Sequence, residues 1–209
     1  TLFPYTTLFR SASPVGMWTD RKILYAKTVN FGALPDNTTK TVAHNIANVD
    51  KIFIGFANAN GLPLPYYPDN FSLNGGISIR CNGTNIIAIT RDDYSDYSAM
   101  ATVFYTKITD SPLPAGVKFA GVWYDGSVIL ERTIDYGSTI AIPNSGFTSI
   151  GMDATNIKMI LYAYGYHTDD ARCCPLIAIK ESNLVKCIAA RAGAGMELRY
   201  FTIRYTTAS

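Results

Sequence analysis

Glutamine is absent from this 209-residue sequence, and glutamate occurs only three times. Long, unbranched residues of this kind favour helices, whereas the 21 threonines, 21 isoleucines and 14 tyrosines favour strands. Sixteen glycines and ten prolines supply the turns that short strands require. The composition therefore predicts an all-β protein and argues against an α/β nucleotide-binding fold.

Several kinds of segment are also missing. The formal net charge is only +2 and no basic stripe occurs, which argues against nucleic acid as a partner. No apolar run approaches the roughly 20 residues that span a bilayer, and nothing resembles a secretory signal, so we expect no membrane insertion.

Cysteine is sparse and lacks the spacing of a metal site. The four cysteines are Cys81, Cys173, Cys174 and Cys187, and no C-x-x-C pair occurs among them. A zinc site is therefore not expected, and a chain of this length can build a core without disulfides. We predict free thiols that are buried or half-buried.

No recognisable catalytic motif is present. The two histidines, His44 and His167, do not align between the halves of the chain, and G-x-S-x-G, P-loop and H-E-x-x-H patterns are all missing. The aspartates of RDDYSDYS and YHTDDAR do not fit a calcium loop and read as solvated loops. We expect no enzyme activity, cofactor or metal, although folding could still bring together the carboxylate pair that a glycosidase needs.

Residues 1–11, TLFPYTTLFRS, resemble the translation of a short-read sequencing adapter left on a metagenomic sequence. We expect this segment to be an artefact and leave it out of the fold prediction. The native N-terminus would then lie elsewhere, and a longer protein could precede residue 12.

The sequence contains an internal repeat. Residues 18–32 align with 123–137 at an offset of 105, residues 51–59 align with 158–166 near an offset of 107, and residues 77–106 align with 177–206 at an offset of 100. Three blocks in chain order indicate two copies of one unit. We predict two tandem antiparallel β-sandwich (jelly-roll-like) domains, residues 12–110 and 117–209, joined by a Pro-rich linker at 111–116.

Short strands are predicted throughout the first copy, and the Asn82-Gly83 pair is a strong hairpin signal. The strands expected there are Ile23–Phe31, which should end at a glycine turn, Thr39–Val42, Lys51–Ala57, Gly76–Cys81, Asn85–Thr90 and Ala99–Thr109. We expect His44, just before the strand at Lys51, to serve a turn or packing contact.

Tyrosines beside carboxylates and amides in loops are the best candidates for a binding site. Aromatic rings stack on the apolar faces of sugars, and polar groups bind the hydroxyls. The loops concerned are Leu62–Phe71, Arg91–Tyr97 and Tyr166–Arg172. The candidate ligand-binding residues are Tyr66, Tyr67, Asp69, Asp92, Asp93, Tyr94, Asp96, Tyr97, Tyr166, His167, Asp169 and Asp170. A packing role for these loop tyrosines is left open.

Tyr162, Tyr164 and Tyr166 alternate along one predicted strand and therefore share one face. Their neighbour Ile160 is apolar. We favour a role for this stripe in filling the sandwich or a subunit interface over a role in sugar binding.

The start of the first copy resembles the C-terminal domains of bacteriophage tail fibre and minor structural proteins. The pattern is W-x-D-G-K-x-[IL]-Y-x-K-[TV], then an aromatic-Gly turn, a Val-x-His segment and a strand that opens with D-x-I. The matching residues are Trp18, Asp20, Lys22, Leu24, Tyr25, Lys27, Thr28, Phe31, Gly32, Val42, His44, Asp50 and Ile52. Arg21 and Asn45 stand where that family usually has glycine. Copy two keeps Trp123, Asp125 and Gly126 but loses the tyrosine and the histidine.

The resemblance implies a virion structural protein at the distal, extracellular end of a phage tail fibre. Its implied partners are a bacterial surface glycan or protein, other phage tail proteins and two further copies of the chain in a homotrimer. The resemblance supplies no catalytic residue. A carbohydrate-binding module of a secreted bacterial enzyme is the main alternative, and a capsule depolymerase is a third.

Overall fold

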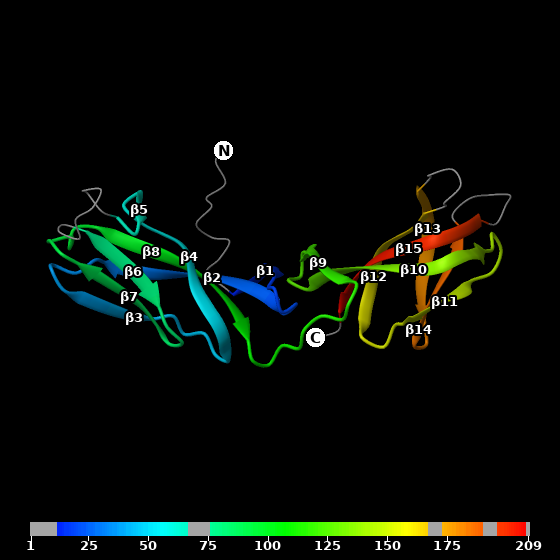
Figure 1. Ribbon diagram of the computed structural model, residues 1–209, viewed down its shortest axis with the longest axis horizontal. Coiled ribbons are helices and arrows are strands. Elements are labelled where there is room, and N and C mark those ends of the chain that lie inside the picture. The colour runs from blue at the N-terminus through cyan, green and yellow to red at the C-terminus, as the bar shows by residue number, and fades with distance from the viewer. Residues whose placement is uncertain (1–11, 67–75, 167–172, 190–195, 208–209) are drawn as a thin grey trace. The chain divides into compact units, whose positions relative to one another are not determined.

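The computed structural model describes residues 12–66, 76–166, 173–189 and 196–207, and these ranges form strands joined by turns (Figure 1). The chain divides into two compact units, Thr1–Pro112 and Leu113–Ser209. This division falls inside the segment that the sequence assigns to the linker. The described ranges contain no helix of the length and hydrophobicity that a membrane crossing requires.

Unit 1 contains eight strands: β1 (Ser13–Met17), β2 (Ile23–Ala33), β3 (Thr39–Ala43), β4 (Val49–Ala59), β5 (Leu62–Leu64), β6 (Ile77–Cys81), β7 (Asn85–Thr90) and β8 (Ser98–Lys107). They form an antiparallel five-stranded sheet in the order β1-β2-β8-β4-β5 and a three-stranded sheet in the order β3-β7-β6. The predicted strands of this copy are thus all present. The sequence did not predict β1 and β5.

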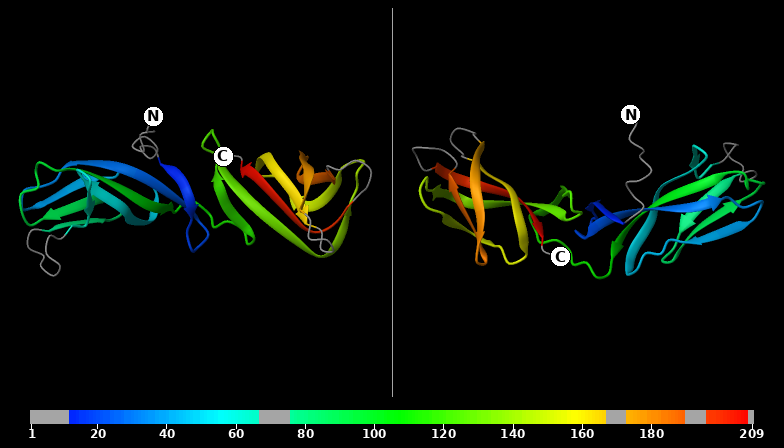
Figure 2. Two further views of the ribbon diagram at one scale, coloured as in Figure 1. Left: turned by 90° about the horizontal axis from the view of Figure 1, so that it is seen from above. Right: turned by 180° about the vertical axis from the view of Figure 1, so that it is seen from behind.

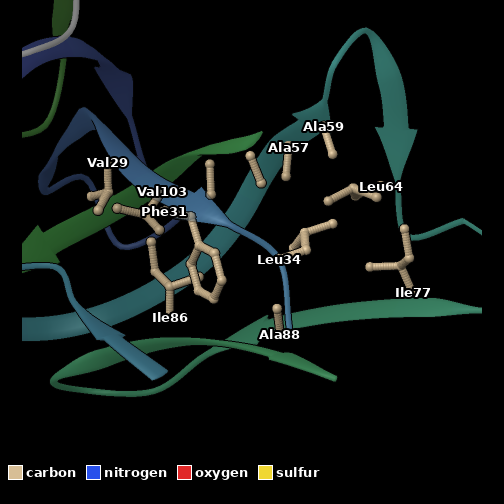
Figure 3. Packing of buried hydrophobic residues seen from close by; sticks show 12 residues of the cluster. Val29, Phe31, Leu34, Ala57, Ala59, Leu64, Ile77, Ile86, Ala88 and Val103 are labelled. Atoms are coloured by element: carbon tan, nitrogen blue, oxygen red, sulfur yellow. The ribbon is translucent and has the colours of Figure 1, made fainter. Parts of the chain in front are cut away.

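The two sheets of unit 1 share one apolar core (Figure 3). Val29 and Phe31 of β2 lie on the inner face of the larger sheet, and Ile86 and Ala88 of β7 meet them from the smaller sheet. On β7 buried and half-buried residues alternate, because successive strand residues point to opposite faces of a sheet. Burial of this apolar surface holds the two sheets together.

Gly32 does not end β2, contrary to the sequence prediction. The strand continues to Ala33, and Gly32 lies in a bulge with a φ of 72° while its N–H donates to the Asn30 side chain over 2.9 Å. Gly137 repeats this arrangement in unit 2, with a φ of 71° and a bond to Asp135. A bulge of this kind requires the left-handed backbone that glycine adopts without strain.

Unit 2 contains seven strands: β9 (Val117–Val122), β10 (Val128–Ile142), β11 (Thr148–Asp153), β12 (Ile157–Tyr166), β13 (Cys173–Glu181), β14 (Leu184–Ala189) and β15 (Met196–Thr207). They form one antiparallel sheet in the order β11-β14-β13-β12-β15-β10-β9. The sheet curls, as Figure 2 shows, so that the Tyr136 hydroxyl on β10 donates to the Ile150 carbonyl on β11 over 3.0 Å.

The strand order of unit 2 repeats that of unit 1. Strands β9, β10, β15 and β12 correspond to β1, β2, β8 and β4, and β14 and β11 correspond to β7 and β3. Strand β13 corresponds to both β5 and β6. It pairs with β12 at one end, as β5 pairs with β4, and with β14 at the other end, as β6 pairs with β7. The two pairings thus belong to two strands of separate sheets in unit 1 and to one strand of a single sheet in unit 2.

Two of the four cysteines, Cys81 and Cys187, differ in burial but not in bonding. Cys187 is buried, Cys81 is half-buried, and both are free thiols, as the sequence predicts. Burial raises the pKa of the Cys187 thiol to about 11. A thiol with so high a pKa is protonated at neutral pH and therefore a poor nucleophile.

Candidate functional site

The predicted loop Arg91–Tyr97 is a fixed turn between β7 and β8. The Ser95 hydroxyl, followed by the Ser95 N–H that donates to the Asp93 carboxylate over 2.9 Å, lowers the pKa of Asp93. The Tyr97 N–H donates to the Tyr94 carbonyl over 2.9 Å, and the Tyr97 carbonyl accepts the Leu34 N–H over 2.8 Å. These backbone bonds fix where the two tyrosines of the loop lie.

The fold places Tyr66 beside this loop. Tyr66 and Ile77 exchange backbone hydrogen bonds of 3.0 and 2.7 Å, and Tyr66 and Tyr94 both pack on the edge of the core. The pKa of Tyr94 is raised, first by burial and then by the proximity of Tyr66. The rings of Tyr94 and Tyr97 meet edge to face, with centroids 5.5 Å apart. We call Tyr66, Tyr94 and Tyr97 the tyrosine end of unit 1.

Exposed carboxylates surround the tyrosine end. Asp92, Asp93 and Asp96 are all exposed, and Tyr97 keeps 37% of its surface accessible. Rings stack on a ligand, and exposed carboxylates beside them can accept hydrogen bonds from its hydroxyls. Within the described ranges, no three or more histidines, cysteines or acidic residues group together to hold a metal ion.

Asn60 is a site residue that the sequence analysis missed. Its amide donates to the Asp96 carbonyl over 3.3 Å, and its side-chain oxygen accepts the Ser98 N–H over 3.2 Å. These bonds tie the turn between β4 and β5 to the loop that carries the tyrosines. The Asn60-Gly61 pair is itself a hairpin signal, and Asn60 has the left-handed φ of 49° that such turns use.

The remaining predicted residues divide into two groups. Tyr67, Asp69, His167, Asp169 and Asp170 lie outside the described residues. Tyr166 ends β12, the strand that corresponds to β4 of unit 1, and its ring centroid lies 6.0 Å from that of Tyr200. Tyr166 therefore belongs to unit 2 and is not part of the tyrosine end of unit 1.

The tyrosine stripe of β12 does not fill a core. Ala163 and Gly165 are the buried residues of this segment, so Tyr162, Tyr164 and Tyr166 point to the opposite face. Tyr162 keeps 51% of its surface exposed and packs on Tyr164 at 5.5 Å. The predicted core role is thus wrong, because the strand alternates and its small residues, not its tyrosines, face inward. The predicted role in a subunit interface stays a prediction.

The residues of the family-like motif stabilise the fold. The Trp18 ring packs on Phe53 at 5.2 Å, and Asp20 pairs with Lys51 at 2.5 Å. Lys22 pairs with Asp50 at 2.7 Å. These contacts join the first hairpin of unit 1 to β4.

His44 has the packing role that the sequence predicts. It is 1% exposed, its Nδ1 accepts the Ile46 N–H over 3.1 Å, and its Nε2 lies 3.2 Å from the Asn82 carbonyl oxygen. A donor and an acceptor on opposite sides require the neutral ring with its proton on Nε2. His44 thus ties the turn after β3 to the hairpin between β6 and β7.

Comparison of the chain with known proteins identifies no homologue. The chain matches no protein-family model, and no curated protein or solved structure shows significant similarity to it. The family resemblance of residues 18–52 therefore stays a prediction.

Proposed function

We propose that this chain is a bacteriophage virion structural protein, a distal tail-fibre module of two tandem antiparallel β-sandwich (jelly-roll-like) domains that attaches to a glycan on the bacterial surface. The observation that carries the proposal is the tyrosine end of unit 1. Two loops that are far apart in sequence place Tyr66 beside Tyr94 and Tyr97, with exposed carboxylates around them. Rings and carboxylates at loop tips are the usual means of binding sugars.

The scaffold supports the same proposal. The residues that resemble the tail-fibre pattern form ion pairs, ring contacts and buried hydrogen bonds in unit 1, which fits a motif that specifies a fold. Two units with one strand order also provide repeated surfaces. Weak contacts on repeated units add up when several engage one cell, more so in a homotrimer.

Binding to bacterial polysaccharides tests the proposal. The full chain is labelled and applied to an array of capsular and lipopolysaccharide glycans, together with Tyr97→Ala and Tyr94→Ala. We expect the wild type to bind at least one bacterial glycan. Each tyrosine variant should bind it about tenfold more weakly, because that is the effect of losing one stacking contact. Tyr124→Ala is the matched control, since Tyr124 is 89% exposed in unit 2. Equal binding by all variants would refute the tyrosine end as the site.

Solution mass separates the tail-fibre proposal from a carbohydrate-binding module of a secreted enzyme. Light scattering should give three times the 22.9 kDa of the chain if the chain trimerises as the tail-fibre proposal predicts. A monomer that binds glycans through the tyrosine end favours the binding module instead.

A further inference from the structure

Unit 1 contains a cleft of about 290 Å³ at a place distinct from the tyrosine end. Its lining includes Lys27, Asn45, Asn48, Tyr105, Lys107 and Thr109. The tyrosine end precedes β8, whereas Tyr105 and Lys107 are at the other end of that strand. The cleft therefore opens where β8 finishes.

The cleft exists because the larger sheet extends past the smaller one. Val29 of β2 and Val103 of β8 lie in the core beneath the smaller sheet, which stops at the pair Ala43–Asn85. Residues further along the same inner face have no sheet above them. Lys27 precedes Val29 by two positions and so continues its face.

The part of the inner face that the smaller sheet does not cover carries polar and cationic side chains, although Tyr105 itself is buried. Tyr25 and Tyr105 face each other across β2 and β8 and stack at 5.4 Å. The Lys107 ammonium stands 4.0 Å from the centre of the Tyr25 ring, and the Lys27 ammonium donates to the Asn45 carbonyl over 3.0 Å. Among the described residues neither ammonium forms an ion pair. The Asp110 carboxylate lies near Tyr25, and its buried Oδ2 has no hydrogen-bond partner in the described ranges.

The loop that walls the cleft presents uncharged polar groups. Asn45 and Asn48 are exposed and adopt left-handed φ angles of 50° and 57°. Their carbonyls accept bonds from Lys27 and from the Ile108 N–H, which fixes the loop, and their side-chain amides enter no hydrogen bond within the described ranges. Two ammonium groups beside amides match a ligand that has one negative group and several hydroxyls.

We infer that this cleft binds an acidic sugar, with Lys27 and Lys107 on its carboxylate and Asn45 and Asn48 on its hydroxyls. The volume suits one sugar residue. This inference rests on the proposed function, and it adds the substrate class: the surface glycan contains a carboxylated sugar.

Unit 2 lacks this arrangement, which makes the cleft a property of unit 1. Leu130 stands where unit 1 has Tyr25, and Thr207 stands where it has Lys107, although Arg132 and Tyr205 correspond to Lys27 and Tyr105. One arginine without a second cation or the ring stack is a weaker anion site.

Titration of the full chain with glucuronate tests the inference, with glucose and inorganic phosphate as the comparison probes and backbone NMR shifts as the readout. We expect glucuronate to shift resonances of residues 45–48 and 107–109 in a saturable way, and glucose and phosphate to leave them unchanged at the same concentration. Lys27→Met and Lys107→Met should each weaken the binding about tenfold. Lys40→Met removes the same charge from the opposite end of β2, where Lys40 donates to the Ala33 carbonyl, and should have no effect.

Three results would overturn the inference. They are no shift with glucuronate, equal shifts with phosphate, which would mark a general anion site, and equal weakening by Lys40→Met. If Lys107→Met perturbs the fold by removing the contact with Tyr25, Lys27→Met alone decides the matter. Failure of these variants together with loss of array binding in the tyrosine variants would reject the cleft and leave the proposed function intact.

Discussion

The hydroxyl oxygens of Thr28 and Thr102 lie 2.7 Å apart across β2 and β8. Unit 2 repeats this contact between Thr133 and Thr202, whose hydroxyl oxygens are 2.9 Å apart across β10 and β15. The sequence alignment matches these same residues at offsets of 105 and 100. A shared register and a shared hydrogen bond are what two copies of one unit should have.

Arg21→Gly should stabilise unit 1. Arg21 has a φ of 66° in the turn between β1 and β2, and the corresponding residue of unit 2 is Gly126 with a φ of 85°. A left-handed backbone costs a residue with a side chain about 1–2 kcal/mol, and glycine removes this cost. Glycine also raises the conformational entropy of the unfolded chain, which offsets part of the gain in stability. We expect a net increase of about 0.5–1 kcal/mol in the free energy of unfolding, measured by urea titration with Trp18 fluorescence in a Trp123→Phe background.

Gly126→Ala is the matched control for this turn. No atom lies within 4 Å of a Cβ added at Gly126, so any loss of stability there reports the backbone conformation alone. Stabilisation by Gly126→Ala, or destabilisation by Arg21→Gly, would contradict the assignment of strain.

Thr206→Val should stabilise unit 2. The Thr206 hydroxyl is buried without a hydrogen-bond partner in the described part of the chain. Its counterpart Thr106 donates to Asp50 over 3.4 Å, and the residue that corresponds to Asp50 is Ile157. Valine has the same shape and no polar atom, so the change should raise the unfolding free energy by about 1 kcal/mol in chemical denaturation.

The same change in unit 1 provides the contrast. Thr106→Val removes a partner from Asp50 and should lower stability. An equal effect of the two substitutions would show that the loss of Asp50 in copy two does not explain the unpaired hydroxyl.

Acid should weaken unit 2 through Asp125. The Lys158 ammonium 2.9 Å away, followed by bonds from Ser127, holds the pKa of Asp125 well below its usual range. A carboxylate with a lowered folded pKa stabilises the fold above its unfolded pKa, about 4, and this stabilisation is lost as the pH falls towards the folded pKa. We therefore expect Lys158→Met to lower the urea midpoint at pH 7. The effect should be smaller at pH 2.5, because there Asp125 of the variant, which lacks the lysine, takes up a proton that relieves its unpaired charge. A difference that is constant between these pH values would contradict the ion pair.

Local patterns predicted six strands of unit 1 and the hairpin that pairs β6 with β7. The alternation of Asn85–Thr90, the Asn82-Gly83 turn and the repeat offsets need only residues close in sequence or aligned copies. The bulge at Gly32 was missed because a glycine after a strand reads as an end, and only the pairing of β2 with β8 on both sides of it shows that the strand continues.

The candidate site depended on contacts that no local pattern contains. Tyr66 meets Tyr94 only because Tyr66 pairs with Ile77, which brings two loops together. The cleft was not predicted for a similar reason. Lys27 and Lys107 read as ordinary strand lysines until the limits of the smaller sheet show which part of the inner face that sheet does not cover.

The central claim is that the tyrosine end attaches the protein to bacterial surface glycan. The most direct measurement is retention of the labelled chain on a panel of bacterial strains, before and after periodate oxidation of the cell surface and, separately, after protease treatment. We predict that the wild type binds at least one strain, that periodate abolishes this binding, that protease does not, and that Tyr94→Ala with Tyr97→Ala removes it. Binding that survives periodate, or that the tyrosine double variant retains, would contradict the claim.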